Sequence, residues 1–145
     1  MGKPNNRGSS MRNQFSTSWI ASKQPRKQRK YIHNAPLHLR HRLLGAHLSK
    51  ELRKKYNKRA IPVRKGDEVI VMRGKFKKKK GKVSQANLKK GTIFIEGLQR
   101  QKKEGAKANI PFFPSKVQIL SLNLDDKERI KSLERRKTEN APNKS

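Results

Sequence analysis

The apolar residues of this chain are concentrated in one segment, which limits what it can fold into more than any other feature. Of its 31 Leu, Ile, Val and Phe residues, 20 lie in residues 61–124, seven in 31–60, two before residue 31 and two after residue 125. Hydrophobic residues make up 31% of the 145-residue chain, which is low for a protein packed throughout. The sequence therefore predicts one small core within residues 61–124, and chain ends that do not belong to it.

The charge of the chain is as unbalanced as its hydropathy. Lys and Arg number 39 against 10 Asp and Glu, which gives a formal net charge of +29. A field of this size destabilises a compact chain by self-repulsion unless a polyanion or its counterions neutralise it. We therefore expect a polyanionic partner, with nucleic acid as the leading candidate.

Short β-prone runs alternate with turn signals in the apolar segment. Five such runs at close spacing predict a small β-barrel. The adjacent Phe112 and Phe113 are expected to split, one ring in the core and one outside. The predicted strands are 69–72, 82–86, 92–95, 109–113 and 117–120, and the turns lie at Gly66, Gly74, Gly91, Gly105 and Pro114.

The segment before the barrel is predicted to form two short helices, over residues 35–45 and 49–56. Asn34 and Ser49 are good amino-terminal caps, and Gly45 interrupts the pattern between them. Apolar residues recur at spacings of 7, 4, 4 and 4, which predicts one helical packing stripe opposite a basic face. The stripe consists of Leu37, Leu44, Leu48, Leu52 and Tyr56.

The two ends are predicted to add a basic arm and a short helical tail. The arm cannot bury enough apolar area to fold alone, so we expect it to order on RNA; a solvated tail or a nuclear targeting run is the alternative. Asp125 and Asp126 suit the amino end of a short helix, and residues 138–145 are expected to fray. The predicted parts are the arm 1–33, the helix pair 34–60, the barrel 61–124 and the helix and tail 125–145.

A lysine-rich connection between the first two predicted strands is the strongest candidate binding site. Residues 75–82 contain six lysines bounded by Gly74 and Gly81, with no acid among them. Such a loop can approach a phosphate backbone and neutralise several charges at once, whereas the alternative is a merely solvated turn. Phe76 is a candidate for base stacking, with a structural role in the barrel as the alternative.

The predicted phosphate contacts extend from this loop to the helix pair and the arm. They are Lys27, Arg29, Lys30, Arg40, Arg42, Lys54, Lys55, Arg73, Lys75, Lys77, Lys78, Lys79, Lys80 and Lys82.

No pattern of residues indicates an enzyme, a metal site or a cofactor. The chain has no cysteine, which excludes disulfides, thiolate nucleophiles and Cys-type zinc sites and favours an intracellular protein. His38, His41 and His47 lack a further ligand and lie among basic residues that would repel a cation. Asp67 and Glu68 point to opposite sides of a strand, so they form no catalytic pair, and we expect an acidic turn that pairs with neighbouring lysines.

Membrane segments are equally unsupported by the sequence. No stretch approaches the roughly 18 apolar residues of a spanning helix or the apolar core of about 7 residues in a signal peptide. We therefore expect a cytosolic protein without membrane insertion. A membrane-surface peptide is disfavoured because the helical stripe is short.

Residues 64–76, which read Arg-Lys-Gly-Asp-Glu-Val-Ile-Val-Met-Arg-Gly-Lys-Phe, are followed by Gly81-Lys82-Val83. This run resembles a KOW motif, which implies a small SH3-like barrel of the kind found in ribosomal proteins and transcription elongation factors. The flanks at 22–30, 35–38 and 48–56 closely resemble the family of large-subunit ribosomal protein twenty-four, called twenty-six in eukaryotes, and most of all its archaeal form. Residues 114–117 and 122–125 agree, so the resemblance covers about residues 18–137.

The resemblance implies a structural constituent of the large ribosomal subunit. Such a protein binds large-subunit ribosomal RNA early in assembly, contacts neighbouring ribosomal proteins and lies near the peptide exit tunnel; we expect no homo-oligomer. A KOW-containing transcription elongation or chromatin factor is the alternative, although such factors carry a further folded domain ahead of the barrel.

The chain departs from the family at two places. Family members commonly have a small residue or glycine within the connection that here reads Lys77 to Lys80. Residues 1–10 extend beyond the usual archaeal start, so either Met1 or Met11 is the initiator.

Overall fold

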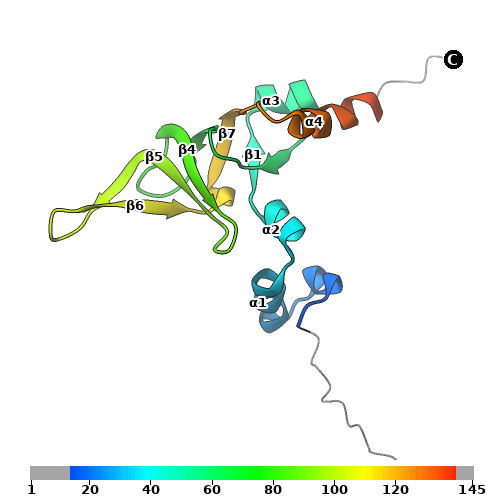
Figure 1. The fold of residues 1–145 in the computed structure, drawn as a ribbon, viewed down its shortest axis with the longest axis horizontal. Coiled ribbons are helices and arrows are strands. Elements are labelled where there is room, and N and C mark those ends of the chain that lie inside the picture. Colours follow the sequence, from blue (N-terminus) through cyan, green and yellow to red (C-terminus); the bar gives the residue numbers. More distant parts are fainter. Residues whose placement is uncertain (1–13, 140–145) are drawn as a thin grey trace, which may run out of the picture. The chain divides into compact units, whose positions relative to one another are not determined.

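The computed structural model describes residues 14–139, and the side chains of residues 14–135. The predicted extension at residues 1–10, the alternative start at Met11 and the end of the predicted tail at 140–145 lie outside the described residues. The chain divides into two compact units, residues 1–39 and residues 40–145 (Figure 1).

The first unit contains two helices that the sequence analysis did not predict. A 3₁₀ helix, η1, spans Thr17–Ala21, and the α-helix α1 spans Pro25–Asn34. Pro25 starts α1 in the position where a missing N–H costs nothing, and the Arg, Lys and Gln residues after it favour helix. Asn34 ends this helix and does not cap the next one, so its predicted capping role is wrong.

Side chains hold the described part of this unit together. The Gln28 amide donates to the carbonyl oxygens of Trp19, Ile20 and Ser22 at 3.1, 3.0 and 2.8 Å. Tyr31 is buried, and its ring stacks on Phe15 with centroids 5.4 Å apart. These contacts give the basic segment a local fold; its ordering by RNA stays a prediction.

The second unit is built on a seven-stranded sheet in the order β2-β1-β7-β3-β4-β5-β6 (Figure 1). Its pairings are antiparallel except that of β1 with β7. Fifteen buried residues form the core that the sheet surrounds, which matches the predicted barrel-like fold with a short carboxyl-terminal helix. The strands are β1 Gly45–Leu48, β2 Ala60–Pro62, β3 Glu68–Val71, β4 Lys80–Asn87, β5 Thr92–Gln101, β6 Lys107–Phe112 and β7 Val117–Ser121.

All five predicted strands are confirmed, and the two Phe residues split as expected. Phe112 is buried at 7% exposure, whereas Phe113 is 52% exposed. Two features were missed, namely the strands β1 and β2 and the length of β5. The predicted run 92–95 continues to Gln101 because Gly97, at φ +77°, accommodates a bulge that moves the pairing with β6 from Phe94 to Gln99.

The two predicted helices before the barrel exist, but a strand separates them. They are α2, Leu37–Leu43, and α3, Lys50–Tyr56. The prediction of a single helical packing stripe is wrong, because Leu48 lies in β1 and Leu37 is 62% exposed. Leu44 and Leu48 instead enter the core, since β1 is inserted between β2 and β7. The predicted Ser49 cap is confirmed: its hydroxyl accepts from the Leu52 N–H at 3.3 Å.

Gly81, the second glycine of the KOW-like run, is required by a close approach of β4 to β5. A β-carbon at this position would lie 2.6 Å from the Ile95 methyl group and 2.9 Å from the Glu96 carbonyl oxygen. Both contacts are shorter than van der Waals packing allows, so the backbone passes here only as glycine.

The last helix, α4, spans Lys127–Glu139 and lies beside α3 (Figure 1). Leu133 on this helix is 1% exposed and belongs to the hydrophobic core. The prediction that the core excludes the chain ends is therefore wrong for this residue. The predicted acidic start of this helix is confirmed, since the Asp126 carboxylate accepts from the Glu128 N–H at 2.9 Å.

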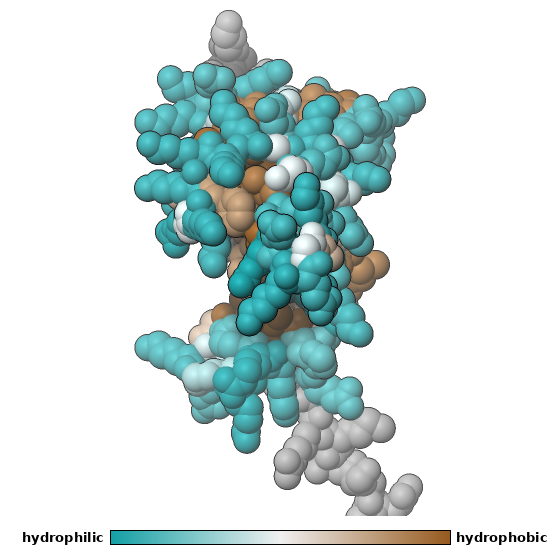
Figure 2. All heavy atoms as spheres, turned by 90° about the vertical axis from the view of Figure 1, so that its left-hand side faces the viewer, coloured by the Kyte–Doolittle hydropathy of each residue, from teal (hydrophilic) through white to brown (hydrophobic). Residues whose placement is uncertain are grey.

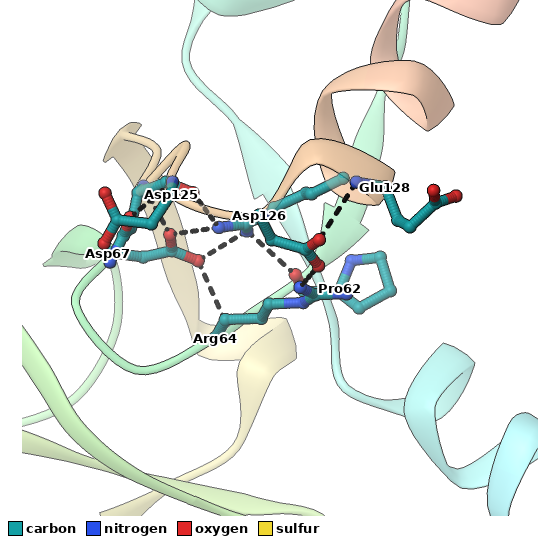
Figure 3. Close-up of polar contacts among 8 residues, drawn as sticks. Pro62, Arg64, Asp67, Asp125, Asp126 and Glu128 are labelled. Carbon is teal, nitrogen blue, oxygen red and sulfur yellow. Dashed lines mark hydrogen bonds and ion pairs between the residues drawn. The ribbon is translucent and has the colours of Figure 1, made fainter.

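A buried ion pair joins α4 to the barrel (Figure 3). Asp67 is fully buried, and its two carboxylate oxygens accept from the Arg129 guanidinium at 2.6 and 2.7 Å. The same carboxylate accepts from the backbone N–H groups of Arg64 and Asn123, each at 2.9 Å. The expected pairing of Asp67 with neighbouring lysines is wrong, because burial demands a bidentate partner and Arg129 supplies it.

An exposed pair lies beside the buried one. Arg64 donates to the Asp126 carboxylate (Figure 3), and this hydrogen bond lowers the pKa of Asp126, followed by the bond from the Glu128 N–H. A lowered folded-state pKa means that Asp126 stabilises the fold above its unfolded pKa, and that this stabilisation is lost as the pH falls through the folded value.

Candidate nucleic-acid interface

The connection between β3 and β4 is a closed loop with internal hydrogen bonds. Gly74, at φ +88°, starts the turn, and its carbonyl oxygen accepts from the Lys77 N–H at 3.1 Å. The Lys78 N–H donates to the Val71 carbonyl oxygen at 2.8 Å, and the Val71 N–H donates to the Lys79 carbonyl oxygen at 2.9 Å. These backbone bonds fix the direction in which the loop presents its side chains.

Every predicted cation of this loop is exposed, from Arg73 to Lys82. In the part of the chain that the structure describes, the ion pairs are Arg64–Asp126, Arg129–Asp67 and Lys131–Glu128, so none neutralises the loop. Seven cations thus gather in this connection and at the start of β4, and all of them are exposed. Water and counterions are readily replaced by phosphate, so this surface is suited to a polyanion.

Lys78 has an unusual backbone conformation. Its φ of +68° lies in the left-handed region, where a side chain other than that of Gly, Asn or Asp is strained. The chain thus has a lysine where the backbone favours glycine, which points to a use for the cation.

Phe76 is half-buried and contacts the core. Its ring meets that of Phe112 edge to face, with centroids 6.0 Å apart and planes at 87°. The Lys79 ammonium lies 5.3 Å from the centroid of the Phe76 ring. Phe76 therefore has a structural contact within the barrel, and its predicted stacking on a base is untested.

The other predicted cations fall on three helices. Lys27, Arg29 and Lys30 lie on α1 in the first unit. Arg40 and Arg42 lie on α2, and Lys54 and Lys55 are exposed on α3. The Lys55 ammonium lies 5.3 Å from the Tyr56 ring centroid, so one of these cations is partly engaged within the protein.

The hairpin of β5 and β6 carries cations that the sequence analysis missed. Residues 96–107 hold Arg100, Lys102, Lys103 and Lys107 against Glu96 and Glu104, a net charge of +2. Figure 2, which faces this side, shows a largely hydrophilic surface with small apolar areas between the charged side chains. The signal in the sequence was the turn at Gly105 between two polar runs, which pair as strands.

Lys116 is a further cation beside the loop. Its carbonyl oxygen accepts from the Met72 N–H at 2.8 Å, next to Arg73 at the end of β3. Its ammonium lies 5.5 Å from the Phe113 ring centroid.

Neither a metal site nor a membrane span is found in the described residues. Within residues 14–139, no group of three or more His, Asp or Glu side chains is placed to hold a metal ion. In that same part of the chain, no helix has the length and apolar character needed to cross a membrane.

Comparison with protein families agrees with this geometry. The sequence model of the family described as ribosomal proteins L26 of eukaryotes and L24 of archaea matches residues 22–136. The matched range includes α1, α2 and α3 as well as the barrel and most of α4. Proteins of this family are structural constituents of the ribosome and not enzymes. The chain therefore belongs to the family of large-subunit ribosomal proteins that comprises eukaryotic L26 and archaeal L24.

Proposed function

We propose that this protein binds large-subunit ribosomal RNA, with the β3–β4 loop as its main phosphate-contacting surface. The observation that carries the proposal is the set of seven exposed cations, from Arg73 to Lys82, that no described acid neutralises. Lysine and arginine contacts to phosphate supply affinity without reading sequence. A-form RNA hides its bases in a deep, narrow major groove, so backbone shape and 2′-hydroxyl contacts supply the specificity.

The other predicted cations on α1, α2 and α3 act with this loop in the proposal. They lie on elements that precede the barrel in the chain and add phosphate contacts to those of the loop. Membership of the family supports two finer statements, namely action early in subunit assembly and a position near the peptide exit tunnel, with neighbouring ribosomal proteins as contacts. The match also includes the segment ahead of the barrel, which favours this function over a transcription or chromatin factor.

Lys78, with its backbone in the left-handed region, offers a test that separates RNA binding from folding stability. In Lys78→Gly the backbone strain disappears, so stability should stay level or rise by up to about 1 kcal/mol. RNA affinity should fall, and the slope of log K against log salt should become shallower by about one. Urea unfolding and RNA titration over a salt series measure the two effects.

Lys77→Gly is the matched control, since the same charge is lost from a residue without positive φ. It should weaken RNA binding in the same way but lower stability by roughly 0.5–1 kcal/mol. If Lys78→Gly binds ribosomal RNA as tightly as the unchanged protein, the phosphate role of Lys78 is wrong.

A further inference from the structure

A cavity of 690 Å³ lies between the β3–β4 loop and the β5–β6 hairpin. It is lined by Lys75, Phe76, Gln99, Arg100, Gln101 and Ile110. Its volume falls within the roughly 300–1,000 Å³ of small-molecule sites. Only Lys75 and Phe76 belong to the phosphate-binding loop, so the cavity adds a second kind of surface to it.

The alternation of side chains along the hairpin explains why a cation enters this cavity. Leu98 is buried, and the two-residue period of a strand puts Arg100 on the same face. Arg100 pairs with Ala108, which shares its face with Ile110 and Phe112. The inner face of the hairpin thus continues past the core, where it changes from Leu98 and Phe112 to Arg100 and Ile110.

The apolar part of the cavity is an aromatic ring held in place. Phe76 is fixed edge to face on the buried Phe112, and Ile110 is half-buried beside the core. A ring held in this way is a rigid surface that loses little entropy when a second flat group stacks on it.

The inward-facing polar part of the lining is positively charged. Lys75 and Arg100 carry this charge. Gln99 and Gln101 alternate with Arg100 along β5, so their side chains lie on the other face of the hairpin, where the Gln99 amide nitrogen donates to the Asn109 side-chain oxygen at 3.0 Å. A flat apolar surface and cations are the features that bind the face and the phosphate of one nucleotide.

We propose that this cavity holds one unstacked nucleotide of the bound RNA. The base lies on Phe76 and Ile110, and Lys75 and Arg100 contact its phosphate. The inference rests on the proposed function and adds to it a contact that requires a base outside the helix. An acidic protein segment would satisfy the cations but would leave the aromatic ring without a flat partner.

Three RNA duplexes of one sequence test this inference. The first carries a single bulged uridine, the second an abasic bulge at the same position, and the third is fully paired. Stacking of one base on an aromatic side chain predicts that the uridine bulge binds at least about five-fold more tightly than the abasic bulge. Equal affinities for the two bulges would overturn the inference but not the proposed function, whereas failure to bind any of the three would overturn both.

Three single variants assign the effect to the cavity. Phe76→Leu keeps apolar volume but removes the flat ring, so the preference for uridine over the abasic bulge should disappear. Arg100→Gln should weaken both bulged RNAs more than the paired duplex. Lys103→Gln, which removes the same charge from the same hairpin outside the cavity, should weaken all three alike. A preference that survives in Phe76→Leu, or equal profiles for Arg100→Gln and Lys103→Gln, would show that a nucleotide does not occupy the cavity.

Discussion

Raising the salt concentration from 50 to 200 mM should weaken binding to ribosomal RNA by a factor of about 10³–10⁵. Each phosphate that a lysine or arginine neutralises releases counterions, and about ten such contacts give a log-log slope near −9 if the relation for duplex DNA applies. The exposed cations of the β3–β4 loop and of the helices supply enough groups for this number. Titrations at several salt concentrations measure the slope directly.

The variant in which Lys77, Lys78, Lys79 and Lys80 are all replaced by Ala shows where the slope originates. It should bind more weakly at low salt, and its slope should be shallower by about 0.9 for each lost phosphate contact. Its far-ultraviolet circular dichroism should stay unchanged, because the loop closes through backbone hydrogen bonds. A matched variant with Lys89, Lys90, Lys127 and Lys131 replaced by Ala has the same net charge and should keep more of the slope. A slope shallower than about −3 for the unchanged protein would contradict binding through many phosphates.

Replacing Asp67 by Asn should lower the free energy of unfolding by roughly 3–5 kcal/mol. The change leaves the Arg129 side chain, which is 3% exposed, buried without its counter-charge. Arg129 lies on α4 and also donates to the carbonyl oxygens of Asn123 and Pro62. If the guanidinium moves when its counter-charge is lost, these bonds weaken as well, and α4 is held less firmly on the barrel. Urea unfolding followed by circular dichroism measures the loss.

Two further variants show whether the cost comes from the unpaired charge. Arg129→Met should be destabilising alone, but combined with Asp67→Asn it should cost less than the sum of the two single changes, since no buried charge is then left unpaired. Asp126→Asn, which breaks the exposed pair with Arg64, should shift the midpoint far less. Full additivity of Asp67→Asn and Arg129→Met would contradict a buried ion pair that acts as a unit.

The barrel could be predicted from sequence because its signals are local. Turn residues such as Gly66, Gly91 and Gly105 do have positive φ, and the β-prone runs between them are strands. Gly81 could also be recognised from the motif, but its structural reason is the close contact of its backbone with Ile95 on β5 and not a turn. The resemblance to a KOW motif rests on part of the same segment, so the motif and the turn and strand signals predicted the same fold for it.

The features that were missed depend on contacts between residues far apart in the chain. Leu44 and Leu48 have helical spacing to Leu52, but the edge that β2 and β7 offer makes residues 45–48 a strand. Arg129 looks like one more surface cation until Asp67, sixty-two residues earlier, gives it a partner inside the protein. In the candidate site the lysine loop could be identified from its charge, whereas Arg100 and the cavity arise only from the register of β5 on β6.

This arrangement also changes how the parts of the chain can be tested. Removal of residues 35–56 would take β1 out of the sheet and Leu44, Ala46 and Leu48 out of the core. The barrel is therefore not expected to fold without them, and point variants on exposed faces are the appropriate tools.

The most direct test of the central claim is crosslinking in cells, with sequencing of the attached nucleic acid and sedimentation of the protein in sucrose gradients. A constituent of the large subunit that binds its RNA should crosslink to a compact set of large-subunit ribosomal RNA segments and sediment with that subunit at moderate salt. The variant with Lys77 to Lys80 replaced by Ala should lose part of these crosslinks, whereas the matched four-lysine control should keep them. Crosslinks spread over messenger RNA or DNA, with the protein absent from the large-subunit fractions, would contradict the account.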